Sequence, residues 1–160
     1  MKKVLLTLSL IGSVVFSSCL KSEQPCMNTP SATQDAKDQQ VIEAYITSKG
    51  LTDVQSTSTG LHYKIITPGE GATPTVNSQV TLSYTGSLTN GLEFDKADYP
   101  INFVLGQLIA GWIEGLPKIK EGGEILLLIP SRLGYGTCAN GPIPGGSVTV
   151  FDITLQTVTN

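Results

Sequence analysis

Residues 104–136 read VLGQLIAGWIEGLPKIKEGGEILLLIPSRLGYG, and this stretch decides the fold of the chain. It predicts a loop, a short amphipathic helix starting near Gly111, a Gly-Gly turn, a buried strand and a loop with an aromatic residue. Pro117 shortens or distorts the helix because proline lacks a backbone N–H. The run from Glu124 to Ile129 is nearly all apolar, which is typical of a central strand covered on both faces. One face of the helix is apolar and is formed by Trp112, Leu116 and Ile119.

The rest of the chain from about residue 60 reads mainly as strands and turns. A first strand is expected at Leu61–Ile66, and Asn90-Gly91 predicts a hairpin turn because these residues tolerate positive φ. Further strands with one buried face are indicated by apolar residues that alternate along the chain: Val80, Leu82 and Tyr84; Ile101, Phe103 and Leu105; Thr149, Phe151, Ile153 and Leu155. The pattern predicts an α+β domain in which a short helix covers one face of a curved antiparallel sheet. About a hundred residues suffice for one such core.

Residues 1–18 have the pattern of an export signal. Lys2 and Lys3 precede an apolar run that ends at Phe16, and small residues follow. The run is too short to span a bilayer permanently. Phe16-Ser17-Ser18-Cys19 resembles a bacterial lipobox, in which Cys19 becomes the first residue and carries lipid chains. We therefore expect a lipid anchor at Cys19; the alternative is an ordinary secretory signal with a chance cysteine.

Two segments separate this leader from the predicted domain. Residues 19–34 are rich in Ser, Thr, Gln, Asn and Pro, which predicts a flexible tether. Residues 35–59 predict a helix from Asp35 to Lys49, ended by Gly50, and then a polar linker. The helix carries one apolar stripe, formed by Val41, Ile42, Tyr45 and Ile46. We expect this stripe to pack on the domain; a dimerisation helix is the alternative.

Charge and cysteine content restrict the partners. Loss of Lys2 and Lys3 with the leader lowers Lys plus Arg from 10 to 8 while Asp plus Glu stays at 13, so the net charge is −5. Such a balance argues against a nucleic-acid partner.

Besides Cys19, the chain contains Cys26 and Cys138, which could form a disulfide in an exported protein or stay independent thiols. The single histidine, His62, has no cluster of ligand residues beside it, so no metal site is expected.

Conventional catalytic motifs are missing from the sequence. It contains no G-x-S-x-G, and Gly69-Glu-Gly71 reads as a turn because no phosphate-loop or dinucleotide pattern follows it. An enzyme with this sequence would have to work without a nucleophile or a cofactor.

Three motifs in order, LGQLIAGW (105–112), LGYG (133–136) and VFDI (150–153), resemble the FKBP-type peptidyl-prolyl isomerases. Tyr84, Phe94-Asp95, Phe103 and Ile143 extend the resemblance, which runs from about Gly60 to Val158. It implies an FKBP-like fold over residues 60–160, to which the predicted helix at residues 35–49 is an addition. It also implies a cofactor-free isomerase that rotates Xaa-Pro peptide bonds in a pocket between aromatic side chains.

The same resemblance implies a role for each pocket residue. Trp112 is expected as the floor, and the Ile109 N–H and the Tyr135 hydroxyl are expected to bind substrate carbonyls. Asp95 is expected as a buried polar group that faces the twisting amide, and Ile143 on a loop that overhangs the cleft. The expected walls are Tyr84, Phe94, Phe103, Leu108, Ile109 and Phe151.

Five residues that border the cleft differ from the family pattern. We expect these differences to affect substrate preference and the affinity for a macrolide ligand more than the isomerase reaction. The five residues are Lys96, Ala110, Cys138, Ala139 and Gly145. The leading hypothesis is a monomeric, exported and lipid-anchored isomerase that acts on proline-containing unfolded or exported polypeptides. The alternatives are a lipoprotein that binds proline-containing segments as a chaperone or scaffold with little turnover, and a purely structural surface lipoprotein.

Overall fold

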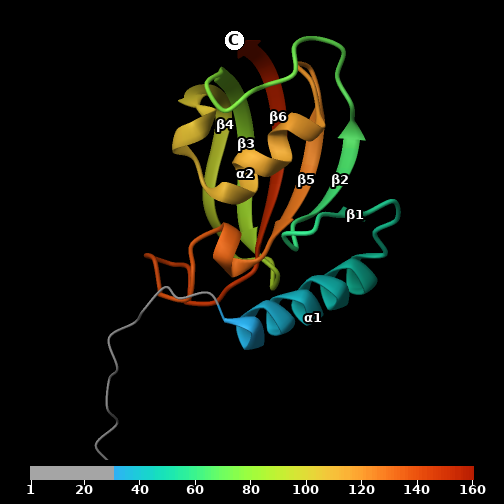
Figure 1. The fold of residues 1–160 in the computed structure, drawn as a ribbon, viewed down its shortest axis with the longest axis vertical. Coiled ribbons are helices and arrows are strands. Elements are labelled where there is room, and N and C mark those ends of the chain that lie inside the picture. Colours follow the sequence, from blue (N-terminus) through green and yellow to red (C-terminus); the bar gives the residue numbers. More distant parts are fainter. Residues whose placement is uncertain (1–30) are drawn as a thin grey trace, which may run out of the picture.

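The computed structural model describes residues 31–160, which are drawn as a ribbon in Figure 1. The helices of this part are α1 (Ala32–Lys49), α2 (Ala110–Gly115) and the short 3-10 helices η1 (Leu105–Gln107), η2 (Leu116–Lys118) and η3 (Ser131–Leu133). The strands are β1 (Gln55–Ser56), β2 (His62–Thr67), β3 (Gln79–Leu88), β4 (Glu93–Val104), β5 (Glu124–Ile129) and β6 (Thr149–Thr159).

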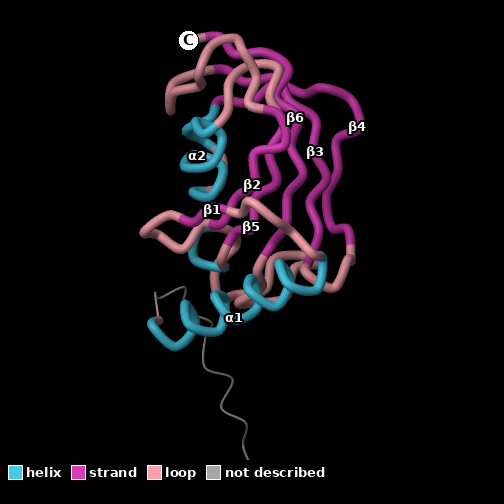
Figure 2. Tube along the Cα trace, turned by 90° about the vertical axis from the view of Figure 1, so that its right-hand side faces the viewer, coloured by secondary structure: helices cyan, strands magenta, loops and turns pink. Residues whose placement is uncertain are grey.

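The strands form one antiparallel sheet in the order β1-β2-β5-β6-β3-β4. β5 and β6 are therefore central, and β4 is an edge strand. Figure 2 shows α2 on one side of the sheet, which curves around it. The predicted α+β architecture, a curved antiparallel sheet around one short helix with an extra N-terminal helix, is confirmed.

The main core lies between α2 and the inner face of the sheet. Trp112, Leu116 and Ile119 are all buried there, as the predicted apolar face requires. The glycines of α2 allow close packing on β5: a Cβ at Gly111 would lie 2.6 Å from Ile129 Cγ2, and one at Gly115 would lie 2.7 Å from Leu127 Cδ2. The α-helix ends at Gly115 and continues as η2 through Pro117, so the predicted shortening is confirmed.

A second buried cluster lies on the other face of β5 and β6, where α1 packs. Ile42 is fully buried and shares this cluster with Leu126, Leu128, Val148 and Val150. The predicted packing of the helix on the domain is thus confirmed, and β5 is covered on both faces as expected. The helix begins at Ala32 rather than Asp35. Val41 does not belong to the buried stripe, since it points about 100° away from Ile42 and is 40% exposed.

Several local expectations differ from the structure. The residues expected as a polar linker, 54–59, include the short strand β1. In the predicted alternation of Ile101, Phe103 and Leu105, Leu105 is fully buried and Phe103 packs against the main core, but Ile101 is 40% exposed on the edge strand. The strand also ends one residue earlier, because Leu105 begins η1. At the hairpin tip only Gly91 has positive φ (90°), and the Leu88 N–H bonds the Leu92 carbonyl at 2.8 Å across the turn.

The predicted leader (1–18), the lipidation site Cys19, the first part of the tether and Cys26 lie outside the described residues. Cys138 is disulfide-bonded, so the alternative that it stays an independent thiol is wrong, while its pairing with Cys26 is not tested by the described residues. Between residues 31 and 160, no helix is both long and apolar enough to cross a membrane. The same residues contain no group of three or more His, Cys, Asp or Glu side chains that could hold a metal ion.

Candidate functional site

A cavity of about 170 Å³ lies where α2 meets strands β3, β4 and β6; we call it the aromatic pocket. Five separate parts of the chain form it: strands β3, β4 and β6, the segment that leads into α2 together with α2 itself, and the loop after η3. Its lining residues are Tyr84, Asp95, Phe103, Leu108, Ile109, Trp112, Tyr135 and Phe151. Every one of them was predicted as a site residue from the sequence.

The aromatic rings of the pocket pack edge to face around Trp112. The Trp112 ring centroid lies 5.1 Å from that of Tyr84 and 5.1 Å from that of Phe151, with interplanar angles of 82° and 89°. Phe103 lies 6.4 Å away at 86°. Such arrangements are favoured because the positive edge of one ring meets the negative face of the other. Trp112 is only 4% exposed, so the base of the pocket is apolar and fixed by its neighbours.

The polar side of the pocket is formed by Asp95 and two tyrosines. The Tyr84 hydroxyl donates a hydrogen bond to Asp95 Oδ2 at 2.7 Å. Burial raises the pKa of Tyr84, and the hydrogen bond to Asp95 raises it further. Burial and, to a smaller extent, the charge of Asp95 also raise the pKa of Tyr135. Both phenols are therefore protonated at neutral pH and can donate hydrogen bonds.

The expectation that Asp95 is buried is wrong. Asp95 is exposed, although one side of it lines the pocket. The reason is its place on β4, which has no neighbouring strand on its outer side. Besides Tyr84, the carboxylate accepts the Lys96 N–H at 2.9 Å, which holds it against the strand.

Three hydrogen-bond donors at the pocket lack a partner within residues 31–160. They are the backbone N–H of Ile109, the Tyr135 hydroxyl and the buried indole N–H of Trp112. Two neighbouring donors are satisfied instead, since the Trp112 and Ile113 N–H groups bond the Ile109 carbonyl at 2.9 and 3.2 Å. The pocket therefore combines an apolar base with donors that an amide-containing ligand could use.

Comparison with known proteins gives the family. The family described as FKBP-type peptidyl-prolyl cis-trans isomerase matches residues 70–156. The chain belongs to this family. It is 39% identical over 140 residues to the FKBP-type peptidyl-prolyl cis-trans isomerase FkpA of Escherichia coli strain K12, covering 86% of this chain and 51% of that protein. It is 47% identical over 114 residues to FkpA of Buchnera aphidicola subsp. Schizaphis graminum, covering 69% and 45%. The chain thus spans about half the length of these curated relatives.

Solved structures support the same assignment. A crystal structure of FkpA from Escherichia coli matches with a TM-score of 0.70 and 36% identity, covering 79% of this chain and 63% of that one. A peptidyl-prolyl cis-trans isomerase from Pseudomonas syringae pv. tomato matches with a TM-score of 0.71 and 28% identity, covering 84% of this chain and 100% of that one. The predicted FKBP-like fold is confirmed.

Two predicted site residues of this FKBP-type domain lie outside the lining. Phe94 packs behind the pocket, with its ring centroid 5.8 Å from Tyr135 and 5.6 Å from Phe151, both nearly perpendicular. It therefore supports two wall residues. Ile143 is only 4% exposed and exchanges backbone hydrogen bonds of 2.9 Å with Asn140, which closes a tight turn in the long loop before β6.

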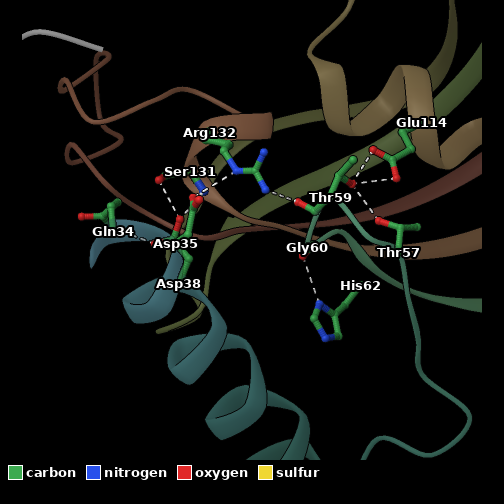
Figure 3. Close-up of polar contacts among 10 residues, drawn as sticks. All are labelled: Gln34, Asp35, Asp38, Thr57, Thr59, Gly60, His62, Glu114, Ser131 and Arg132. Carbon is green, nitrogen blue, oxygen red and sulfur yellow. Dashed lines mark hydrogen bonds and ion pairs between the residues drawn. The ribbon is translucent and has the colours of Figure 1, made fainter. Parts of the chain in front are cut away.

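A polar network that was not predicted from the sequence joins α1 to the FKBP-type domain (Figure 3). Asp38, 1% exposed, accepts hydrogen bonds from Ser131, which begins η3. Arg132 bonds Asp35 and the Thr59 carbonyl, and the Thr59 hydroxyl bonds Glu114 of α2. One signal was available: Asp38 lies four residues before Ile42, so it shares the buried face of the helix.

Proposed function

We propose that this chain is a peptidyl-prolyl cis-trans isomerase that acts on proline-containing polypeptides without a cofactor. The observation that carries the proposal is the aromatic pocket, in which a buried tryptophan base stands beside donors that have no partner within residues 31–160. A proline ring is apolar and compact, and the amide before it is polar. The pocket offers a surface for each part.

The reaction needs rotation about one amide bond, whose barrier is about 18–20 kcal/mol because resonance stiffens the bond. At about 20 kcal/mol the uncatalysed rate is on the order of 0.01 per second, and each 1.36 kcal/mol removed accelerates it tenfold. A reduction of about 4–6 kcal/mol would therefore make an effective catalyst. The twisted amide has less charge separation than the planar one, so transfer into an apolar pocket disfavours it less. Hydrogen bonds that favour the twisted form add to this difference.

Each pocket residue then has a role in the proposed mechanism. Trp112 supports the proline ring, with Tyr84, Phe103 and Phe151 around it. The Ile109 N–H and the Tyr135 hydroxyl bind substrate carbonyls and hold the chain on both sides of the rotating bond. Asp95 acts mainly by fixing Tyr84, because its carboxylate already accepts the Tyr84 hydroxyl.

The test is isomerisation of short Xaa-Pro peptides by the purified chain and by Tyr135→Phe. We expect wild-type acceleration and a fall on the order of tenfold in kcat/KM for Tyr135→Phe, since one directed hydrogen bond is lost. Tyr99→Phe is a matched control, because Tyr99 is 83% exposed and does not line the pocket. Equal activity of all three proteins would exclude the proposed role of Tyr135.

We further propose that the protein is exported and lipid-anchored, and that its substrates are exported polypeptides. This rests on the leader pattern of residues 1–18 and the lipobox-like Phe16–Cys19. Palmitate labelling of cells that express the chain, compared with Cys19→Ser, tests the anchor. Labelling that persists in Cys19→Ser would exclude this cysteine as the site.

A second candidate is a module that binds proline-containing segments with negligible turnover. It is favoured by the loop at residues 137–146, where Cys138, Ala139 and Gly145 depart from the family pattern and where Ile143 is buried outside the pocket lining. Trp112 is the only tryptophan, so its fluorescence reports binding of a proline peptide or of a macrolide. Binding without acceleration of isomerisation would favour this candidate over the first.

A further inference from the structure

Asp38 is an acid whose side chain is buried between α1 and the domain, only 1% exposed. Its Oδ2 accepts hydrogen bonds from the Ser131 N–H and the Ser131 hydroxyl, both at 2.7 Å. Its Oδ1 accepts one from Gln34 Nε2, also at 2.7 Å. All three donors are neutral, and neither ion pair found among residues 31–160 includes Asp38. A buried carboxyl group is tolerated only where hydrogen bonds replace its lost water, as they do here.

Ser131 connects Asp38 to the loop that follows η3. Its carbonyl accepts the N–H of Gly134 at 3.1 Å and the N–H of Gly136 at 2.7 Å. These two residues flank Tyr135, which lines the aromatic pocket. Ser131 is therefore held by Asp38 through its N–H and its hydroxyl, and through its carbonyl it holds the backbone on both sides of Tyr135.

A second connection restrains the same segment from another side, as Figure 3 shows. Arg132 Nε bonds Asp35 Oδ1 at 3.0 Å, and Arg132 Nη2 bonds the Thr59 carbonyl at 2.6 Å. The Thr59 hydroxyl lies 2.8 and 2.7 Å from the two carboxylate oxygens of Glu114 in α2. Helix α1 is thus tied to the segment that carries Tyr135 and, through Thr59, to the helix that carries Trp112.

We propose that Asp38 is a positioning residue for Tyr135, so that α1 sets the geometry of the isomerase pocket through Ser131. This inference rests on the proposed function. Docking of α1 alone does not require a carboxyl group, because Ile42 already buries an apolar side chain against Leu126, Leu128, Val148 and Val150. What Asp38 adds is a directed contact with the residue that fixes the Tyr135 loop.

The test compares Asp38→Ala and Asp38→Asn in kcat/KM for Xaa-Pro isomerisation, each alone and combined with Tyr135→Phe. Asp38→Ala removes the acceptor, and we expect a fall on the order of tenfold in kcat/KM. Asp38→Asn keeps one acceptor oxygen for Ser131 and should retain most of the activity. In the Tyr135→Phe background the effect of Asp38→Ala should vanish to within about twofold, because coupled residues are non-additive.

Two further measurements separate positioning from stability. Hydrogen exchange at the Gly134 and Gly136 amides should accelerate about tenfold in Asp38→Ala and not in Ile42→Val. The reason is that, of Asp38 and Ile42, Asp38 is the one that bonds Ser131, whose carbonyl accepts both amides. Ile42→Val is the control for weaker packing of α1, and its kcat/KM should equal that of the wild type. If Asp38→Ala unfolds the chain, Ser131→Ala tests the same link, because it removes only the hydroxyl contact and should show a smaller fall in the same direction.

The outcomes distinguish the two proposals. An inactive wild type overturns the proposed function and the positioning role with it. An active wild type that depends on Tyr135, with Asp38→Ala folded and fully active, overturns the positioning role alone. An equal loss from Asp38→Ala with and without the Tyr135 hydroxyl also overturns it, because Asp38 would then act through another part of the domain.

Discussion

The Tyr84 hydroxyl donates a hydrogen bond to the Asp95 carboxylate at 2.7 Å, between neighbouring strands of the sheet. Asp95 of β4 lies opposite Gly86 of β3. Tyr84 lies two residues before Gly86 on β3, so its side chain reaches Asp95 diagonally across the two strands. The Tyr84 ring lies 5.1 Å from Trp112. An exposed acid on the edge strand is thereby linked to the base of the pocket, and its contact with Tyr84 gives it a way to influence isomerisation indirectly.

Asp95→Ala is expected to lower kcat/KM for Xaa-Pro peptides on the order of tenfold, while Asp95→Asn keeps most of the activity. The reason is that an amide oxygen can still accept the Tyr84 hydroxyl. Tyr84→Phe should act like Asp95→Ala, and the double variant should be no worse than either single one. If Asp95→Asn loses as much as Asp95→Ala, the negative charge itself is required and the indirect role is wrong.

The raised pKa of Tyr84 predicts a loss of stability at high pH. Burial and the Asp95 hydrogen bond make the folded state hold the phenolic proton more tightly than the unfolded state, whose tyrosine pKa is about 10. The free energy of unfolding should therefore be independent of this group below about pH 9 and fall as the pH rises through 10. Urea unfolding of wild type and Tyr84→Phe between pH 7 and 11 tests this, because the other tyrosines cancel in the comparison. A difference that stays constant across this range would contradict it.

Gly86→Ala should displace the rings of Phe151, which lines the aromatic pocket, and of Phe94, which supports it. A Cβ at Gly86 would lie 2.6 Å from Phe151 Cε1 and 3.0 Å from Phe94 Cε2, so both rings would have to move. We expect a loss of about 1–3 kcal/mol in the free energy of unfolding, together with lower kcat/KM. Gly91→Ala is the matched control: its φ of 90° makes alanine strained by about 1–2 kcal/mol, but no atom lies within 4 Å of its Cβ. Equal activity of the two variants would show that the rings adapt without consequence.

Local periodicity predicted the apolar face of α2 and the central strand, but it failed for Val41 in α1 and for Ile101 on the edge strand. Trp112, Leu116 and Ile119 recur at helical spacing and are buried together, and the apolar run Glu124–Ile129 is covered on both faces because α2 and α1 lie on opposite sides of it. The lining of the pocket was predicted by resemblance and not by periodicity. Its residues come from five separate parts of the chain, which no local pattern relates.

Features that depend on the order of strands in the sheet, or on contacts between residues far apart in the sequence, were not predicted. Asp95 was expected to be buried, but its exposure follows from β4 being the edge strand, which alternation along β4 does not reveal. The bonds from Ser131 to Asp38 join residues 93 positions apart. An acid in a helix is ordinarily a solvated side chain. Only the fold shows that this one meets the start of η3.

Ile42→Ala should show how far α1 contributes to the stability of the domain. Ile42 is fully buried against Leu126, Leu128, Val148 and Val150, and truncation leaves a cavity, so we expect a loss of about 2–5 kcal/mol in the free energy of unfolding. Val41→Ala, at the neighbouring 40% exposed position, should change it by less than about 0.5 kcal/mol. Urea denaturation followed by Trp112 fluorescence and by helical circular dichroism measures both. Coincident transitions would mean that α1 unfolds with the sheet, whereas a helix signal that is lost first would mean that α1 docks as a separate unit.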